Sequence, residues 1–276
     1  MRCLECVEVP TLGQLPCLRV LEMDGMGKVR CIGSEFYFYS DGSYRNTTTI
    51  LFPALRILKL TRMHRLEEWK DAKELTTADE VLFVFPCLEE LKITRLIQLR
   101  DLPDSMCVSL QKLVVQNCPM LRSLPGVRSI IRCGIEDTTS RLEYLENMWD
   151  YRPPSTSSIH PSLQKLKLKL YESQYFLHSP HTLLLLDQIQ YFIALKILWI
   201  QRFHEIGALP EGLGNLSSLQ KLYIVDCNNL VLLPTKEAMR RLTQLKMLEI
   251  YGCPNLEDSE RSKIDHIPFV NINDNG

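Results

Sequence analysis

The chain lacks the sequence features of membrane-spanning, secreted and nucleic-acid-binding proteins. Within its 276 residues the leucine run at positions 183–186 is only four long, whereas a membrane-spanning helix needs roughly 20 apolar residues. The first residues contain no apolar segment of the kind found in signal peptides. The formal net charge is −1, which provides no bulk attraction to a nucleic-acid backbone. We therefore expect no membrane span, no secretion signal and no nucleic-acid partner.

The short motifs that mark common catalytic and cofactor sites are also missing. The sequence contains no phosphate loop ending in Gly-Lys-Ser/Thr, no His-Glu-x-x-His motif and no Gly-x-Ser-x-Gly motif. Cys3-x-x-Cys6 has the spacing of half a zinc site, but no second pair follows it. We expect no catalytic site, no cofactor, no bound metal and no enzymatic activity.

Ten cysteines are scattered along the chain, and several occupy apolar positions of the repeat described below. This arrangement is typical of buried, reduced thiols rather than of a disulfide framework. The cysteines therefore predict a protein of a reducing compartment, either the cytoplasm alone or the cytoplasm and the nucleus.

Leucine recurs at a fixed spacing from one end of the chain to the other. The clearest copy reads Leu219-x-x-Leu222-x-Ile224-x-x-Cys227 and closes at Leu233-Pro234. Copies of Leu-x-x-Leu-x-Leu, with Ile, Val or Met accepted at the last position, begin at Leu18, Leu55, Leu88, Leu110, Leu163, Leu195, Leu219 and Leu245. Several successive copies start 22 to 26 residues apart, within the range of roughly 20–29 that is typical of leucine-rich repeats.

The repeat predicts a solenoid, because a short strand with one apolar face can bury that face only against neighbouring copies. The expected fold class is α/β: a leucine-rich-repeat horseshoe whose concave face is a parallel sheet of about eight short strands. One domain should span residues 1–276, with strands centred on residues 20–23, 57–60, 90–93, 112–115, 165–168, 197–200, 221–224 and 247–250. Convex helices are expected at 182–192 and 236–242, a degenerate repeat at 129–135, and a C-terminal cap within 264–272.

Two features outside the strands carry further expectations. Cys118, Cys227 and Cys253 follow their strands where each coil turns inward, and a small weak donor there can satisfy a turn carbonyl of the next coil. At the N-terminus nothing in the sequence covers Leu4, Leu12 and Leu15. Because the end of a solenoid leaves apolar surface and a strand edge open, we expect this edge to be prone to aggregation.

A partner would bind on the concave face, where residues between and just after the last two leucines of each copy point outward. This face grades from acidic, through basic, to aromatic along the chain. Lys165, Lys167 and Lys169 lie on one strand; they form either a solvated strand face or a patch that attracts an acidic partner. Trp199, Tyr223 and Tyr251 lie in consecutive copies and are expected to form a column, either as partner-binding anchors or packed only on one another.

Three stretches resemble a specific family. The first is residues 11–21 (TLGQLPCLRVL), followed by Gly25, Met26, Val29 and residues 32–37 (IGSEFY). The second is residues 52–55 (FPAL), leading to Met63 and residues 66–69 (LEEW), and the third is residues 264–268 (IDHIP). Together they resemble the C-terminal leucine-rich region of plant nucleotide-binding, leucine-rich-repeat disease resistance proteins of the coiled-coil class. The resemblance covers nearly the whole chain, but it includes no counterpart of the nucleotide-binding module, so nucleotide binding is not implied.

The resemblance implies a non-enzymatic protein-recognition module in plant intracellular immunity. Its partner would be a protein: a pathogen effector, a guarded host protein, or the nucleotide-binding module of a resistance protein. The alternative is a leucine-rich-repeat adaptor or scaffold of another cytosolic complex, such as the substrate arm of a ubiquitin ligase, which would need an F-box that the region before Leu18 does not supply.

Overall fold

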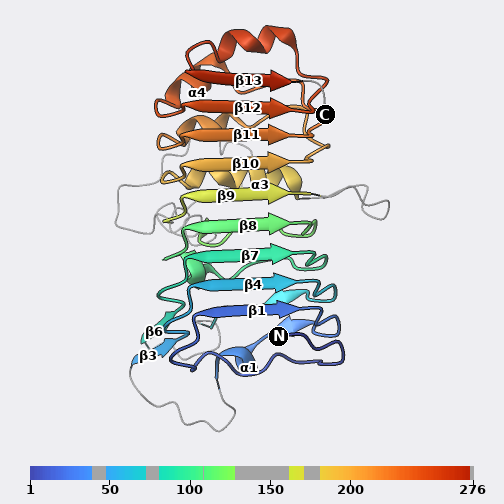
Figure 1. Cartoon of the computed structure of the whole chain (residues 1–276), viewed down its shortest axis with the longest axis vertical. Helices are drawn as coiled ribbons and strands as arrows, with labels where there is room; N and C mark the ends of the chain where they lie inside the picture. Colours follow the sequence, from blue (N-terminus) through green and yellow to red (C-terminus); the bar gives the residue numbers. More distant parts are fainter. Residues whose placement is uncertain (39–47, 73–80, 108, 128–161, 171–180, 274–276) are drawn as a thin grey trace, which may run out of the picture.

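The computed structural model of the chain describes residues 1–38, 48–72, 81–107, 109–127, 162–170 and 181–273. In these ranges nine parallel strands form one sheet, in the order β1-β4-β7-β8-β9-β10-β11-β12-β13. Figure 1 shows them stacked like rungs from the N-terminal end to the C-terminal end. Their bounds are Val20–Asp24 (β1), Ile57–Thr61 (β4), Glu90–Thr94 (β7), Lys112–Gln116 (β8), Lys165–Lys169 (β9), Ile197–Gln201 (β10), Lys221–Val225 (β11), Met247–Tyr251 (β12) and Phe269–Asn273 (β13).

The leucine spacing sets the register of this sheet. Equivalent repeat positions pair directly, as Leu198 does with Leu222 and Leu222 with Leu248. Leu222 is 1% exposed and Leu248 is 0% exposed, so these leucines form a continuous buried column between the coils. The eight predicted strands and the solenoid fold are confirmed, and the predicted closing strand is β13, which pairs with β12.

The convex side carries short helices, and the two that the sequence predicts are confirmed. Helix α3 (Thr182–Gln188) continues into the 3-10 helix η5 (Ile189–Tyr191), and α4 spans Lys236–Arg241. Figure 1 places α3 and α4 behind the sheet. The side chain of Thr235 caps α4 by accepting from the Ala238 N–H at 3.3 Å. Further short helices are α1 (Ser34–Tyr37), η2 (Asp104–Cys107), η6 (Glu211–Asn215) and η7 (Asp258–Lys263).

Two small parallel sheets flank the N-terminal coils and were not predicted. One pairs β2 (Cys31–Ile32) with β5 (Glu68–Trp69), and the other pairs β3 (Thr48–Leu51) with β6 (Val81–Val84). Phe52 and Phe85 follow β3 and β6, and their buried rings stack with centroids 4.7 Å apart. These sheets account for the longer repeats in this part of the chain.

The prediction of a degenerate repeat between Leu110 and Leu163 is wrong for the sheet, which has no place for a strand of such a repeat. Residues 129–135, where it was expected, lie outside the described residues. Strand β8 nevertheless pairs directly with β9 over five residues, from Lys112 with Lys165 to Gln116 with Lys169. Because these strands are immediate neighbours, no strand can lie between them in the sheet.

After seven of the nine strands, all except β9 and β13, the described chain turns through a left-handed residue. Positive φ values occur at Gly25, Arg62, Arg95, Asn117, Arg202, Asp226 and Gly252. The thiols of Cys118, Cys227 and Cys253 are buried as predicted. They donate to the carbonyl two residues earlier in their own coil, at 3.5, 3.6 and 3.5 Å, so the carbonyl is not, as expected, one of the next coil. Burial raises the pKa of the Cys118 thiol to about 12, which keeps it protonated and unreactive.

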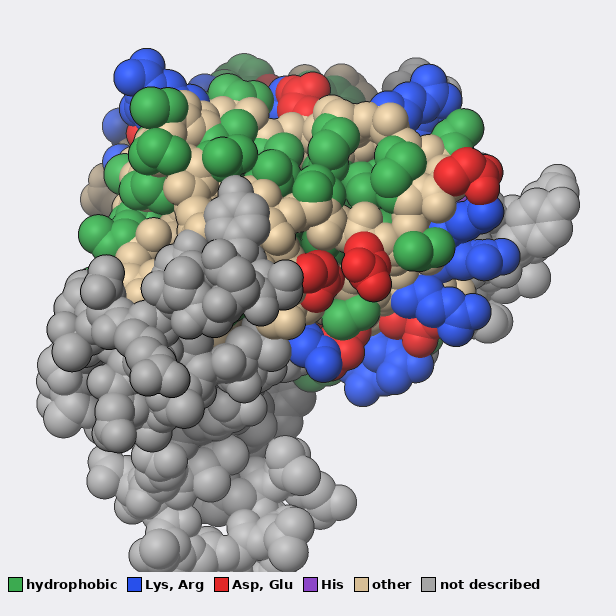
Figure 2. Space-filling view, turned by 90° about the horizontal axis from the view of Figure 1, so that it is seen from below, with side chains coloured by type: hydrophobic (Ala, Val, Ile, Leu, Met, Phe, Trp, Pro, Cys, Tyr) green, Lys and Arg blue, Asp and Glu red, His purple; other side chains and the backbone are tan. Residues whose placement is uncertain are grey.

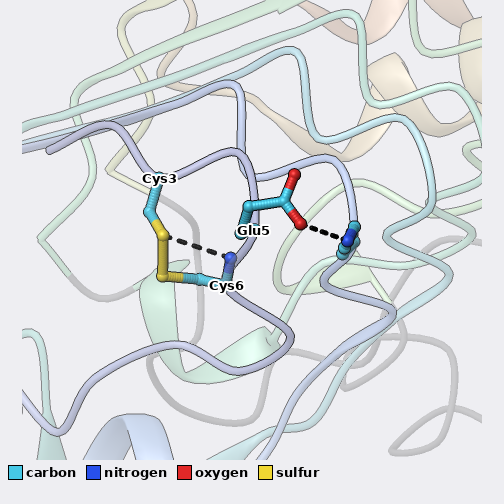
Figure 3. Close-up of a disulfide and its surroundings, with 4 residues drawn as sticks. Cys3, Glu5 and Cys6 are labelled. Atoms are coloured by element: carbon cyan, nitrogen blue, oxygen red, sulfur yellow. Dashed lines mark hydrogen bonds and ion pairs between the residues drawn. A yellow bond between two sulfur atoms is a disulfide. The ribbon is translucent and has the colours of Figure 1, made fainter.

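The N-terminal cysteines contradict the expectation of reduced thiols. Cys3 and Cys6 form a disulfide, and the Cys6 N–H lies 3.1 Å from the Cys3 sulfur. Figure 3 shows this short loop, with Glu5 of the same loop in an ion pair with Lys28. The two-residue spacing suits either a zinc half-site or a local disulfide, and the spacing alone could not distinguish them.

The N-terminal end of the solenoid exposes apolar side chains. Figure 2, viewed onto this end, shows hydrophobic side chains across much of the described surface. Leu4 is 59% exposed and Leu15 is 37% exposed, as expected, whereas Leu12 is half-buried against the core. Met1, Val7 and Val20 are also exposed. Residues 1–2 lie along part of the outer edge of β1, where Arg2 bridges to Asp24 and the Met1 ammonium donates to the Glu22 carbonyl.

We expect the chain to self-associate through this end at high concentration. Replacing Leu4 and Val7 together with lysine should shift the chain toward monomer, because charge on an open edge opposes pairing. As a control, replacing Leu183 and Leu184, which are exposed on α3, with lysine should leave the association unchanged. Light scattering on a sizing column measures both; a monodisperse wild-type monomer at high concentration would contradict the expectation.

Candidate functional site

The concave face consists of three rows of outward-facing side chains. The strand register fixes them, because alternate residues of each strand point to the same side. We define the central row as the directly paired residues Glu22, Lys59, Lys92, Val114, Lys167, Trp199, Tyr223, Glu249 and Asn271. A first row lies two residues before it on each strand and a third row two residues after it. The sheet therefore presents a continuous surface across all nine described strands.

Three of the predicted site residues are in direct contact in the central row. The Lys167 ammonium lies 4.3 Å from the centroid of the Trp199 ring. The Trp199 and Tyr223 rings stack with centroids 4.6 Å apart and an interplanar angle of 23°. We call these three residues the aromatic column. Such cation–ring and ring–ring contacts fix the side chains in place, so the column is already ordered before any partner arrives.

The aromatic column leaves one polar group unsatisfied. The indole N–H of Trp199 is buried and has no hydrogen-bond acceptor among the described residues. Buried donors without partners are uncommon in folded proteins. At the other end of the column the Tyr223 hydroxyl donates to the Met247 sulfur at 3.5 Å, which anchors it to the next coil.

Tyr251 does not belong to this column, and the prediction that it does is wrong. It pairs with Val225 in the third row, while Glu249 pairs with Tyr223 in the central row. The Tyr251 hydroxyl instead accepts from the Asn271 amide at 2.8 Å. The reason is the position in the strand. Tyr223 comes one residue after the buried Leu222, whereas Tyr251 comes three residues after the equivalent Leu248.

Lys165 and Lys169 flank the column on β9 but occupy different rows. Lys165 is exposed in the first row beside Lys112, and Lys169 is half-buried in the third row beside Gln116. The pKa of Lys167 is held below its usual value, first by burial and then by the charges of Lys169 and Lys92. The middle of the concave face is therefore a site of mutual repulsion between ammonium groups.

The acidic end of the face is internally paired. Glu22 accepts from Lys59 at 2.5 Å, and the Asp24 carboxylate accepts from the Arg62 Nε at 2.8 Å. These hydrogen bonds lower the pKa of both carboxyls. On the neighbouring strands Glu90 accepts from Lys112 at 3.0 Å. The expected gradation from acidic through basic to aromatic is present, but its acidic part is already neutralised within the protein.

One further depression lies away from the concave face. It has a volume of about 410 Å³ and is lined by residues 67–71, 100–104 and Arg122. Both carboxylates and basic side chains line it, so it offers no charge of a single sign. Within the described ranges no cluster of three or more His, Cys, Asp or Glu side chains is placed to hold a metal ion. The described helices include none with the length and apolarity needed to cross a bilayer.

Comparison with known proteins identifies relatives but no family. No protein-family model matches the chain. It is 27% identical over 253 residues to disease resistance RPP13-like protein 1 of Arabidopsis thaliana, covering 88% of this chain and 19% of that protein. It is 31% identical over 120 residues to a second Arabidopsis disease resistance protein, covering 44% of this chain and 6% of that one.

Among solved structures, an internalin from Listeria monocytogenes aligns with a TM-score of 0.33 and 14% identity, covering 91% of this chain and 66% of the internalin. The chain spans about a fifth or less of the curated relatives that it matches. The resemblance read from the sequence is confirmed: this chain is a leucine-rich-repeat solenoid whose relatives are plant disease resistance proteins.

Proposed function

We propose that the chain is a non-enzymatic protein-recognition module of plant intracellular immunity, which binds a partner protein on its concave face. The partner would be a pathogen effector, a guarded host protein or the nucleotide-binding module of a resistance protein. The relatives support a role in plant immunity, since both are disease resistance proteins of a plant. The observation that carries the proposal is the aromatic column, because ordered aromatic side chains on an open surface are typical anchors of protein interfaces.

The proposed contact includes all six predicted residues in their observed arrangement. Lys167, Trp199 and Tyr223 form its centre, Lys165 and Lys169 flank it on β9, and Tyr251 borders it in the third row. The proposed location is the cytoplasm, with the nucleus included. A reducing compartment would open the Cys3–Cys6 disulfide, but this loop lies at the N-terminal end, well separated along the sheet from β9–β12.

Site-directed cross-linking tests the proposal. The chain would carry a photoreactive phenylalanine derivative at Tyr223, or at Gln244 as a control, an exposed position just before β12. In extracts of plant tissue we expect cross-linked protein bands from position 223 that are absent from position 244. Equal labelling from both positions, or none from 223, would overturn the concave-face assignment.

Trp199→Ala should weaken partner binding by about 2 kcal/mol or more, mainly through a faster off-rate. The change removes the centre of the aromatic column and frees Lys167 and Tyr223 from their ring contacts. Surface-immobilised binding kinetics with the cross-linked partner measures the rates. Tyr251→Ala serves as the comparison and should cost less, since it lies outside the column. An unchanged off-rate for Trp199→Ala would contradict the anchor role, provided thermal unfolding shows that the variant is folded.

A further inference from the structure

The concave face gathers lysines on three adjacent strands in the middle of the sheet. Lys92 lies on β7, Lys112 on β8, and Lys165 and Lys167 on β9. Lys112 is paired with Glu90. For Lys92, Lys165 and Lys167 the described residues supply no carboxylate within ion-pair distance. We call these three residues the unpaired lysines.

This distribution contrasts with that of the neighbouring strands. The charges of β1 are neutralised by the next coil, because Glu22 pairs with Lys59 on β4 and Asp24 with Arg62 just after β4. The nearest compensation for Lys167 is the Trp199 ring rather than an anion. Since like charges held close together raise the free energy of the unbound protein, an anionic partner gains by neutralising them.

The spacing of the unpaired lysines indicates the shape of that partner. Adjacent strands lie about 4.8 Å apart, so Lys92 and Lys167 are separated by two strand steps, about 10 Å. One further step leads to Trp199. The distance from Lys92 to Trp199 is thus about 14 Å, which an extended chain covers in about four residues at 3.3 Å each. Anions placed at intervals along a polypeptide fit this spread better than a single compact anion does.

Resting on the proposed function, we propose that the partner presents an extended acidic segment ending in a large apolar side chain. Its carboxylates would lie over Lys92, Lys165 and Lys167, and its apolar side chain against Trp199 and Tyr223. The segment would cross the strands along the central row, from β7 to β11. Carboxylates would draw the Lys167 ammonium from the Trp199 ring and uncover apolar surface for the adjoining side chain.

A pair of synthetic peptides tests the charge requirement on the full chain. One peptide carries four consecutive glutamates followed by Leu-Phe, and the other has glutamine in place of every glutamate. We expect the glutamate peptide to bind at least about tenfold more tightly in titration calorimetry, with affinity falling as salt rises. Equal binding of the two peptides, or no binding of either, would overturn the proposal. So would displacement of the glutamate peptide by equimolar inorganic triphosphate, which would indicate a compact-anion site.

Protein variants localise the effect. The triple change Lys92→Gln, Lys165→Gln and Lys167→Gln should weaken the glutamate peptide by about tenfold and flatten its salt dependence. Lys246→Gln is the matched control, since Lys246 is exposed just before β12 and outside the three rows, and should change affinity less than about twofold. If the triple variant binds the peptide like the wild type, the acidic-segment assignment fails. If the acidic-segment assignment fails but position 223 still cross-links to a partner, the protein-recognition function stands. If position 223 forms no cross-link either, both proposals fail.

Discussion

Leu222→Ala should lower the free energy of unfolding by about 2–5 kcal/mol, as removal of a large side chain from a packed core does. Leu222 is 1% exposed and lies between Leu198 and Leu248 in the buried column. Truncation leaves a cavity that neither neighbouring coil can close without breaking its own strand pairing. Urea unfolding followed by circular dichroism measures the loss.

Leu232→Ala is the matched control from the same repeat. Leu232 is 40% exposed, so the same truncation there should cost less than about 1 kcal/mol. Hydrogen exchange should show which strands the substitution destabilises. In a solenoid whose coils contact only their neighbours, Leu222→Ala should raise exchange in β10, β11 and β12 and leave β1 protected as before. An equal rise in β1 would show that the coils unfold as one unit.

Glu260→Ala should cost about 2–3 kcal/mol, because it removes a buried carboxylate that holds two groups of the chain. Glu260 is 3% exposed. Its carboxylate accepts from the Leu233 N–H at 2.7 Å and from the Lys263 ammonium at 2.7 Å. Lys263 also donates to the Leu233 carbonyl at 3.4 Å. The alanine variant leaves a buried N–H without an acceptor and a partly buried charge without a counterion.

Two controls separate the contributions. Glu260→Gln keeps an oxygen that can accept from Leu233, so it should recover part of the loss. Asp258→Ala breaks the ion pair with Arg261 on the same 3-10 helix, but the Asp258 side chain is 99% exposed. That change should cost less than about 0.5 kcal/mol. Thermal and urea unfolding measure all three variants, and similar losses for Asp258→Ala and Glu260→Ala would contradict the role of burial.

The strand positions were predictable because the repeat leaves little choice of register. Once Leu222 and Ile224 face the core, Tyr223 must face outward, and a shift of one residue would bury Lys221. The convex elements were predictable only where a local pattern exists. Helix α4 follows Thr235 after Pro234, which is a capping signal, whereas the β3–β6 sheet depends on contacts between residues that no short pattern links.

The arrangement of the candidate site residues was only partly predictable from the sequence. Grouping Tyr251 with Trp199 and Tyr223 by residue type ignored the register, which places Glu249 in that row. The contact of Lys167 with Trp199 follows from the pairing of β9 with β10. It could be read from the sequence, because the two residues hold the same position in neighbouring copies of the repeat. The pairing of Glu22 with Lys59 follows from the register in the same way. The pairing of Asp24 with Arg62 does not, because Arg62 lies beyond the end of β4.

The direct pairing of β8 with β9 also bears on the order of folding. Residues 117–164 separate these two strands, whereas residues 202–220 separate β10 from β11. Closing a connecting segment roughly two and a half times longer costs about 0.8 kcal/mol more in chain entropy. Contacts that close shorter segments form sooner. We therefore expect β1–β8 and β9–β13 to begin folding as two separate nuclei, which meet last at the junction where the unpaired lysines lie.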